Sequence, residues 1–427
     1  MHSRPALWTA FLVVHAWLAV VGVVMIPQRA FWDLDLYRYW MWQGVFTDQW
    51  PVLDTSSVYP AGAVVPMLMA GIGGLGYGAG YAIAWCVMVT ALDAAALGLL
   101  LRRAQGMVGG WWWTAFLLLL GPIAMGRLDA VIVPITLVAL LWALERPAVA
   151  SALLTIGAWI KVAPGALLVS VLLAARRPWR DVIAPAAGVS ALVVGTVVAL
   201  GGGGNVASFL LEQDQRGLQI EAPGATPWLV VALFSRRVSR VLNQEISTWE
   251  VQGPGTQGMA DTLGVLFFVA IVGVAALLWW RRETLGHRMW TDTVARGELL
   301  LRGAMLLTLA MLVFNKVGSP QYMTWLAAPV VAALGLGLPG WQFTARWVLV
   351  VAAATQIVFP WFYTEITYGG AGTTAILAAR NALLVVLLVT TARDLVRDSA
   401  PAPLTQVADA RAVRSAPRER EVAAPRR

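Results

Sequence analysis

The stretch "MHSRPALWTAFLVVHAWLAVVGVVMI", residues 1–26, starts with a basic segment and continues as an apolar run of about twenty residues. A run of this length can cross a bilayer as one helix, and it is longer than the apolar core of a signal peptide. It contains no clear small-x-small cleavage site. We therefore expect it to be an uncleaved first transmembrane helix.

The rest of the chain has the same character. Of its 427 residues, 59% are hydrophobic and 13% are charged, which is too little polar surface to cover a soluble globule of this size. We predict an all-α polytopic membrane protein, with one transmembrane domain over residues 1–392 and a disordered cytoplasmic tail, rich in Ala, Pro, Arg and Glu, over residues 393–427. The apolar runs predict about twelve helices, near residues 6–26, 81–101, 110–124, 130–144, 148–162, 163–175, 181–200, 261–280, 299–315, 322–338, 345–361 and 373–392.

The basic residues predict how these helices are oriented in the plasma membrane. The positive-inside rule is satisfied when both termini are cytoplasmic and the two longest connecting stretches, 27–80 and 201–260, are extracytoplasmic. This topology requires residues 57–79 to be interfacial or re-entrant, because a full crossing there would place Arg102 and Arg103 outside. Orientation explains the net charge of +8, so nucleic-acid binding is not expected. The clusters that share the cytoplasmic side are Arg4, Arg102 with Arg103, Arg146, Arg176 with Arg177 and Arg180, Arg281 with Arg282 and Arg288, and the tail.

Few residues are available for metal or redox chemistry. Cys86 is the single cysteine, and the three histidines, His2, His15 and His287, lie in different parts of the chain. We therefore expect no intramolecular disulfide, no metal site and no cofactor. Asp93 lies near the middle of a predicted span, where it is either a buried structural acid or part of a proton path.

Polar side chains gather instead at the outer ends of the predicted helices. Charges at membrane depth are costly and usually line a functional cavity. The first outer loop carries two carboxylates beside the aromatic segment "YRYW", residues 37–40, which is typical of an interfacial amphipathic helix. The residues that converge on this face are Asp33, Asp35, Arg127, Asp129, Lys161, Arg216, Glu221 and Lys316.

Cations beside a lipid phase suit the phosphate of an anionic lipid head group. If a sugar leaves from a polyprenyl phosphate, Arg and Lys stabilise the departing phosphate, and one Asp takes the proton of the attacking hydroxyl. This chemistry needs no histidine and no metal. Structural interpretations stay open: solvated loop acids or a helix cap for Asp33 and Asp35, a structural pair for Arg127 and Asp129, snorkelling for Lys161, and a helix anchor for Lys316.

Five segments carry a further signal: "FWDLDLYRYWMWQGVFTDQWPVLDTSSVYPAGA" (31–63), "GRLDAVIVP" (126–134), "KVAPGALL" (161–168), "RGLQIEAPGATP" (216–227) and "NKVGSPQYMTWLAAP" (315–329). Together they resemble the polyprenol-phosphate-mannose-dependent mannosyltransferases of glycosyltransferase family 87, a branch of the GT-C membrane glycosyltransferases found widely in actinobacteria. The resemblance implies a GT-C-type bundle, a β-linked polyprenyl-phosphate mannose donor and inversion to an α-mannoside. It also implies acceptors such as phosphatidylinositol mannosides, lipoglycans or other envelope glycans.

The resemblance assigns roles to individual residues. The first-loop Asp of a D-x-x-x-Y pattern, here Asp33 with Tyr37, is then the catalytic base, so Asp33 ranks above Asp35. The expected ligands of the donor phosphate are Arg127, Lys161, Arg216 and Lys316. The expected substrate pocket contains Tyr37, Tyr59, Asp129, Glu221, Gln321 and Tyr322.

Two departures from the family pattern affect the substrate. "YPAGA" at 59–63 stands where "YPPGA" is usual, and the outer side lacks the histidine that some members place in the pocket, which leaves the acceptor open. Related enzymes transfer arabinofuranose or glucose, so these sugars are alternatives to mannose. A lipid-linked-sugar flippase is an alternative outside the enzymes, but it would favour polar residues on both sides of the membrane. The sequence names no protein partner.

Overall fold

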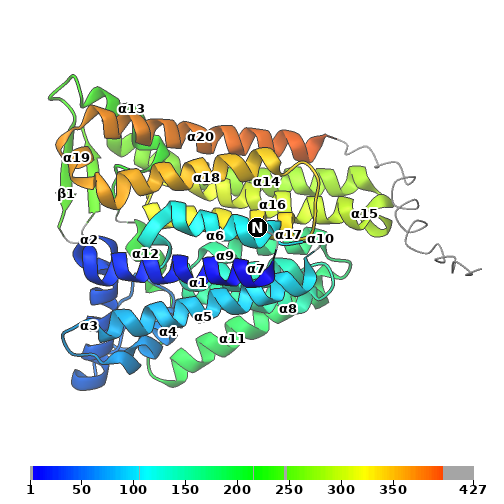
Figure 1. The fold of residues 1–427 in the computed structure, drawn as a ribbon, viewed down its shortest axis with the longest axis horizontal. Coiled ribbons are helices and arrows are strands. Elements are labelled where there is room, and N and C mark those ends of the chain that lie inside the picture. Colours follow the sequence, from blue (N-terminus) through cyan, green and yellow to red (C-terminus); the bar gives the residue numbers. More distant parts are fainter. Residues whose placement is uncertain (1–2, 105, 215, 245–247, 398–427) are drawn as a thin grey trace, which may run out of the picture.

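The computed structural model describes residues 3–104, 106–214, 216–244 and 248–397 as a helical bundle (Figure 1). A hairpin of two antiparallel strands, β1 (Ser239–Asn243) and β2 (Thr248–Gln252), lies at one end of the bundle. The helices are α1 (Arg4–Val20), α2 (Pro27–Ala30), α3 (Trp32–Thr47), α4 (Val64–Ala70), α5 (Gly80–Arg103), α6 (Val108–Leu120), α7 (Asp129–Trp142), α8 (Pro147–Ile160), α9 (Ala163–Ala166), α10 (Leu168–Ala174), α11 (Ala184–Ala199), α12 (Ser208–Asp214), α13 (Thr226–Val231), α14 (Thr256–Leu285), α15 (Arg288–Thr291), α16 (Thr293–Val313), α17 (Ala327–Gly335), α18 (Gln342–Gln356), α19 (Tyr363–Tyr368) and α20 (Ala371–Val396).

Long apolar helices identify an all-α protein that is embedded in a membrane. In the described residues, 6 helical stretches are long and apolar enough for a crossing. They are Arg4–Met25, Gly80–Arg103, Trp179–Ala199, Thr256–Leu285, Gln342–Trp361 and Ala371–Val396.

The expectation of about twelve spans is not confirmed, although each of the twelve predicted ranges contains helix. Several of these helices, such as α7 and α8, have 14 residues, fewer than the ~20 that a straight crossing needs. α16 is longer but carries Arg296, Glu298 and Arg302 along its first half. A pattern of apolar runs therefore located the helices but did not distinguish spans from buried shorter helices.

Interior and lipid-facing helices differ in how much of their surface is covered. Every residue of α16 from Gly297 to Val313 is buried, as expected for a helix at the centre of a bundle. In α11 and α14, by contrast, only 11% and 17% of the most apolar window is buried, so these helices present apolar surface to lipid.

Two polar clusters fasten helices inside the bundle. His15 of α1 contacts Asp93 of α5 through Nε2 and Oδ2 at 3.0 Å, and both side chains are buried. This pair supplies the partner that the structural interpretation of Asp93 requires. Elsewhere, Arg302 of α16 contacts both Glu298 and Asp394, joining α16 to α20.

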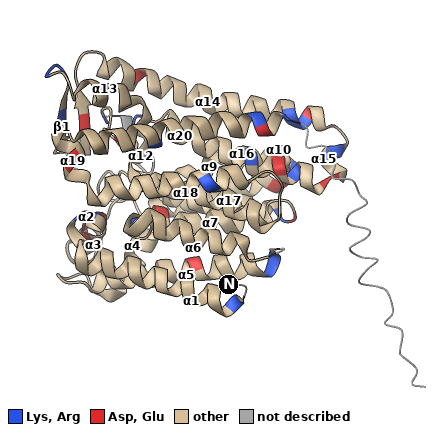
Figure 2. Cartoon of the chain, turned by 45° about the horizontal axis from the view of Figure 1, so that its top comes forward, with Lys and Arg blue, Asp and Glu red and all other residues tan. Residues whose placement is uncertain are grey.

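Basic residues predicted to share one side of the membrane lie together at one end of the bundle, here called the basic end. Their contacts show this, since Arg4 donates to the carbonyl of Leu101, and Arg176 donates to that of Trp290. In Figure 2, Lys and Arg gather at this end, near α15 and the start of α1. The opposite end, here called the loop end, carries α2, α3, α19 and the β1–β2 hairpin (Figure 1). That the basic end is cytoplasmic stays a prediction.

Two predicted segments need comment. Residues 57–79 form a helical stretch over Ala61–Gly73, which is shorter than a straight crossing. α20 continues to Val396, beyond the predicted domain boundary at 392. The rest of the predicted tail, residues 398–427, lies outside the described residues.

Candidate active site

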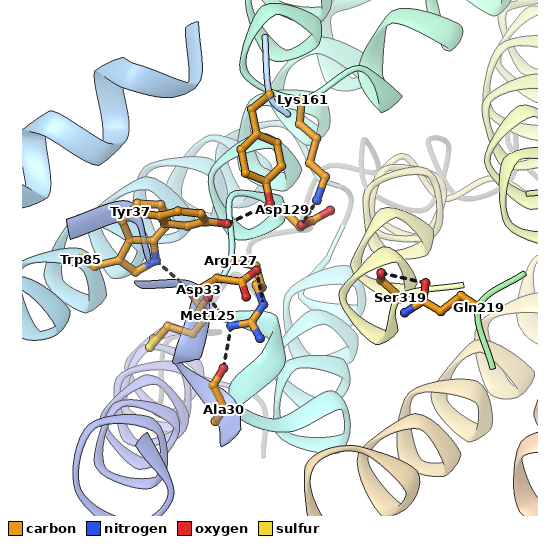
Figure 3. Close-up of polar contacts among 12 residues, drawn as sticks. Ala30, Asp33, Tyr37, Trp85, Met125, Arg127, Asp129, Lys161, Gln219 and Ser319 are labelled. Carbon is orange, nitrogen blue, oxygen red and sulfur yellow. Dashed lines mark hydrogen bonds and ion pairs between the residues drawn. The ribbon is translucent and has the colours of Figure 1, made fainter. Parts of the chain in front are cut away.

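Asp33 lies in the first turn of α3, where a carboxylate interacts favourably with the positive end of the helix dipole. Its Oδ2 is 2.9 Å from Nε of Arg127, which lies just before α7 (Figure 3). The Arg127 side chain is 6% exposed and that of Asp33 is 23% exposed. The ion pair therefore holds the predicted base in a fixed place while its side chain stays partly accessible.

Backbone carbonyls fix the guanidinium of Arg127. Its Nη1 donates to the carbonyl oxygens of Ala30 at 2.8 Å and Gly126 at 2.9 Å. The ring of Phe31 lies 2.2 Å from where a Cβ of Gly126 would stand, so only glycine allows the α2–α3 segment to pack this closely against residue 126. This packing brings Asp33 to Arg127 across a large sequence distance.

Asp35, the alternative base, has a different environment. Its side chain is 62% exposed and lies 3.5 Å from Arg38, which also donates to the carbonyl of Leu75. Residues two apart on a helix do not share a face, so Asp35 does not join Asp33 at Arg127. Which of the two aspartates is the base stays a prediction.

Asp129 and Lys161 form a second ion pair. Lys161 Nζ is 2.5 Å from Asp129 Oδ2, and the indole Nε1 of Trp325 donates to Asp129 Oδ1 at 2.7 Å. The ammonium also lies 5.0 Å from the ring centre of Tyr322, within cation–π range. The proposed structural pairing of Arg127 with Asp129 is wrong, because each residue has another partner.

Two tyrosines connect the two ion pairs. The hydroxyls of Tyr37 and Tyr59 are 3.4 Å apart, and the Tyr37 ring packs against Trp85 at 5.5 Å between centres. Burial, followed by the neighbouring hydroxyl, raises the pKa of Tyr37 well above its ordinary value, and burial also raises the pKa of Tyr59. Both side chains therefore act as neutral hydrogen-bonding groups.

A cavity of about 330 Å³ opens beside Tyr59 and Lys161, and its size suits a small polar ligand. Three cations from separate elements line it: Lys161, Arg216 and Lys316. The Nε of Arg216 is buried and has no hydrogen-bond partner among the described residues. Predicted residues that line the cavity are Tyr59, Lys161, Arg216, Lys316, Gln321 and Tyr322; the lining residues Asn315, Ser319 and Trp325 were not predicted, although they belong to the quoted segment 315–329.

Gln219, which sequence reasoning missed, holds two cavity loops together. Its Oε1 accepts from the backbone N–H of Gly318 at 3.0 Å and from the Ser319 hydroxyl at 3.3 Å (Figure 3). Its own N–H donates to the carbonyl of Lys316 at 3.0 Å. Gly318 approaches Ala222 so closely that a Cβ would lie 2.3 Å from the Ala222 nitrogen. Arg216 and Lys316 are thereby carried on loops that fix each other.

The sequence of the chain matches a known protein family. The family model described as glycosyltransferase family 87 matches residues 58–295, more than half of the chain. The chain belongs to glycosyltransferase family 87. No curated protein and no solved structure matches. The matched range of this family 87 member includes Arg127, Lys161 and Arg216, whereas Asp33 precedes it.

A second hollow in this family 87 glycosyltransferase adjoins the cavity. It has a volume of about 700 Å³, is largely apolar and lies among α8, α10, α11 and α14. Residues shared by both hollows are Val162, Phe209, Leu210, Phe267 and Met311. Because α11 and α14 face lipid, this groove connects the polar cavity with the surface that the bilayer covers.

Six of the predicted site residues do not line the cavity: Asp33, Asp35, Tyr37, Arg127, Asp129 and Glu221. Glu221 is buried, and its backbone carbonyl accepts from Arg380 Nη2 at 2.6 Å. Burial, partly offset by a hydrogen bond with Tyr363, raises the pKa of Glu221 to about 7. Glu221 therefore supports the loop that bears Arg216 rather than facing a ligand.

The described residues contain no group of three His, Cys, Asp or Glu side chains that could hold a metal ion. That the enzyme works without a metal or cofactor stays a prediction.

Proposed function

We propose that this family 87 glycosyltransferase transfers a sugar from a polyprenyl-phosphate donor to a hydroxyl of a lipid-linked or envelope glycan, with inversion at the anomeric carbon. One observation carries the proposal: a cavity lined by Lys161, Arg216 and Lys316 adjoins an apolar groove. Tyr59 in the cavity wall also contacts Tyr37, on the helix that carries Asp33. A phosphate linked to a long apolar chain matches this combination of a cationic pocket and a lipid-facing groove.

The cations act on the leaving group. As the acceptor oxygen bonds to the anomeric carbon, the bond from that carbon to the phosphate oxygen breaks, and the electron pair leaves with the phosphate. Fixed positive charges stabilise the developing charge in a site that excludes water. Lys161 is positioned for this by Asp129, and Arg216 brings a buried Nε without a partner among the described residues.

Asp33 acts on the acceptor. Its ion pair with Arg127 holds the carboxylate in place, and the partly exposed side chain can accept the proton that the acceptor hydroxyl loses. Tyr59 lines the cavity and contacts Tyr37, one turn after Asp33 on α3. We propose that the acceptor enters between Tyr59 and Asp33, opposite the departing phosphate.

The proposed sugar, product and acceptor rest on the resemblance to the family 87 mannosyltransferases. We propose mannose as the sugar, an α-mannoside as the product, and phosphatidylinositol mannosides, lipoglycans or other envelope glycans as acceptors. Arabinofuranose and glucose are the alternative sugars. The loop end would face the extracytoplasmic side of the plasma membrane, with both termini cytoplasmic, and no metal or cofactor would take part.

The test is transfer of radiolabelled mannose from polyprenyl-phosphate mannose to extracted envelope lipids by the purified full chain, with Asp33→Asn in parallel. Labelled product from the wild type alone supports the enzyme class, the donor and the base. Transfer only from the arabinose or glucose donor would replace the sugar and keep the mechanism. Binding of the donor without transfer from any sugar donor would replace the transferase with the flippase.

A further inference from the structure

Three arginines from different elements converge on one tryptophan, Trp290 of α15, at the basic end. Arg176 follows α10, Arg282 belongs to α14, and Arg296 belongs to α16. Their guanidinium carbons lie 5.5, 5.6 and 5.7 Å from the ring centre of Trp290, each within cation–π range. We call these four residues the Trp290 cluster.

Backbone contacts hold two of the three guanidiniums in place. Arg176 Nη2 donates to the carbonyl of Trp290 at 3.0 Å, and Arg296 Nε donates to that of Ala174 at 2.8 Å. Each contact uses one N–H group, whereas a guanidinium has five. The remaining N–H groups are available to bind a ligand, and the backbone contacts already hold these two guanidiniums in position.

The charges of the cluster are not balanced within the part of the chain that the structure describes. None of the three arginines has a carboxylate there within ion-pair distance. Arg302 at the same end, by contrast, has Glu298 and Asp394, and Arg103 has Glu145. Guanidiniums that share one ring repel each other, so an anion bound among them would relieve that repulsion.

The position of the cluster indicates the source of the anion. Arg282 stands where the lipid-facing helix α14 leaves its apolar stretch, two residues after Trp280. Trp279 and Trp280 are 55% and 47% exposed. Trp179, close to Arg176 in sequence, is 75% exposed. Exposed tryptophans mark the level of lipid head groups, where the phosphate of a phospholipid lies.

We propose that the Trp290 cluster is a binding site for the phosphate of an anionic phospholipid. The planar forks of arginine suit phosphate oxygens, and the exposed tryptophans are at the level expected for lipid head groups. The site is separate from the proposed sugar transfer, so a binding measurement tests it whatever the enzyme's substrate.

The experiment is native mass spectrometry of the purified full chain titrated with phosphatidylglycerol or phosphatidylcholine. The double variant Arg176→Gln/Arg282→Gln is compared with Arg102→Gln/Arg103→Gln, which removes the same charge at the same end outside the cluster. We expect preference for phosphatidylglycerol in the wild type and the control, and a loss of about fivefold in affinity for each charge removed from the cluster. Lysine at both cluster positions should restore part of the affinity, since it keeps the charge but not the fork.

Equal affinity for the two lipids, or equal losses in the two double variants, would overturn the proposal. Competition by millimolar inorganic phosphate that displaces the lipid completely would show a site for soluble phosphate instead. If the double variant does not fold by circular dichroism, Arg282→Gln alone decides, because its guanidinium makes no hydrogen bond to the described residues.

Discussion

The Asp33 region and the Asp129 region contain the same kind of pair, an aspartate beside a cation, but the two carboxylates are used differently. Asp129 is fully buried, and both of its oxygens are engaged, one by Lys161 and one by the Trp325 indole. Asp33 is 23% exposed and is engaged by Arg127 through one oxygen. A carboxylate that is partly accessible can accept a proton from a substrate. A fully buried carboxylate with both oxygens engaged can only position the residues that it contacts. The comparison separates a candidate base from a structural acid.

The largest effect should come from Asp33→Asn. The amide keeps the shape of the side chain but cannot act as a base, so the turnover number should fall by roughly 10²–10⁴. Some stability should also be lost, because the buried guanidinium of Arg127 loses its carboxylate partner. Its hydrogen bonds to the carbonyls of Ala30 and Gly126 remain, so the protein should still fold. The measurements are sugar transfer under donor saturation and the melting temperature in detergent. Turnover within threefold of the wild type would move the base elsewhere, with Asp35→Asn as the next variant.

Asp129→Asn should show the opposite pattern, with loss of stability as its main effect. It leaves the Lys161 ammonium buried beside an uncharged partner, and breaking a buried pair in this way costs about 3–5 kcal/mol. The measurement is the unfolding free energy, or the melting temperature where unfolding is irreversible. The double variant Asp129→Leu/Lys161→Met should recover much of the stability, because neither charge then remains. A fully stable Asp129→Asn protein would contradict the structural role.

Sequence reasoning found both aspartates but not their partners. Arg127 and Asp129 stand two apart, and their closeness in sequence suggested a pair. Positions two apart at the start of a helix point to different sides, so Arg127 faces α3 and Asp129 faces Lys161. The partner of Arg127 comes from α3, and such long-range pairing depends on packing such as that of Phe31 on Gly126.

Dependence on long-range packing also explains other differences between the sequence predictions and the structure. Apolar runs predicted the helices because each run is a local property, but His15 and Asp93 meet only through the packing of α1 on α5. Glu221 was expected in the pocket since it shares a segment with Arg216. The turn between them directs Glu221 instead toward Tyr363 and Arg380, which lie far along the chain. Gln219, between the two, carried no signal because amides seldom mark a site on their own.

Glu221 is a third carboxyl for this comparison. It is buried, and its hydrogen bonds only partly offset the effect of burial on its pKa. Its pKa rises from 4.5 to about 7, so between these values the folded state binds a proton that the unfolded state releases. The contribution of Glu221 to stability is therefore full below pH 4.5 and is lost as the pH rises through 7, by about 3 kcal/mol. Glu221→Gln should remove this part of the pH dependence in melting temperatures measured from pH 4 to pH 9. Identical slopes in the two proteins would show that Glu221 titrates normally.

The cations Lys161 and Arg216 differ in the same way as the two aspartates. Lys161 is held by a buried carboxylate, while the buried Nε of Arg216 has no hydrogen-bond partner among the described residues, so a donor phosphate should gain more from Arg216. Arg216→Gln should raise the KM for the donor about tenfold, because a charged hydrogen bond to the bound phosphate is lost. It should also lower kcat, because the same positive charge stabilises the charge that develops on the departing phosphate. Arg236→Gln, at an exposed arginine between α11 and α14 like Arg216, is the matched control and should leave both constants unchanged. A fall in kcat with constant KM would mean that Arg216 acts only as the phosphate departs, and equal effects of the two variants would reduce its role to the general positive charge of the loop.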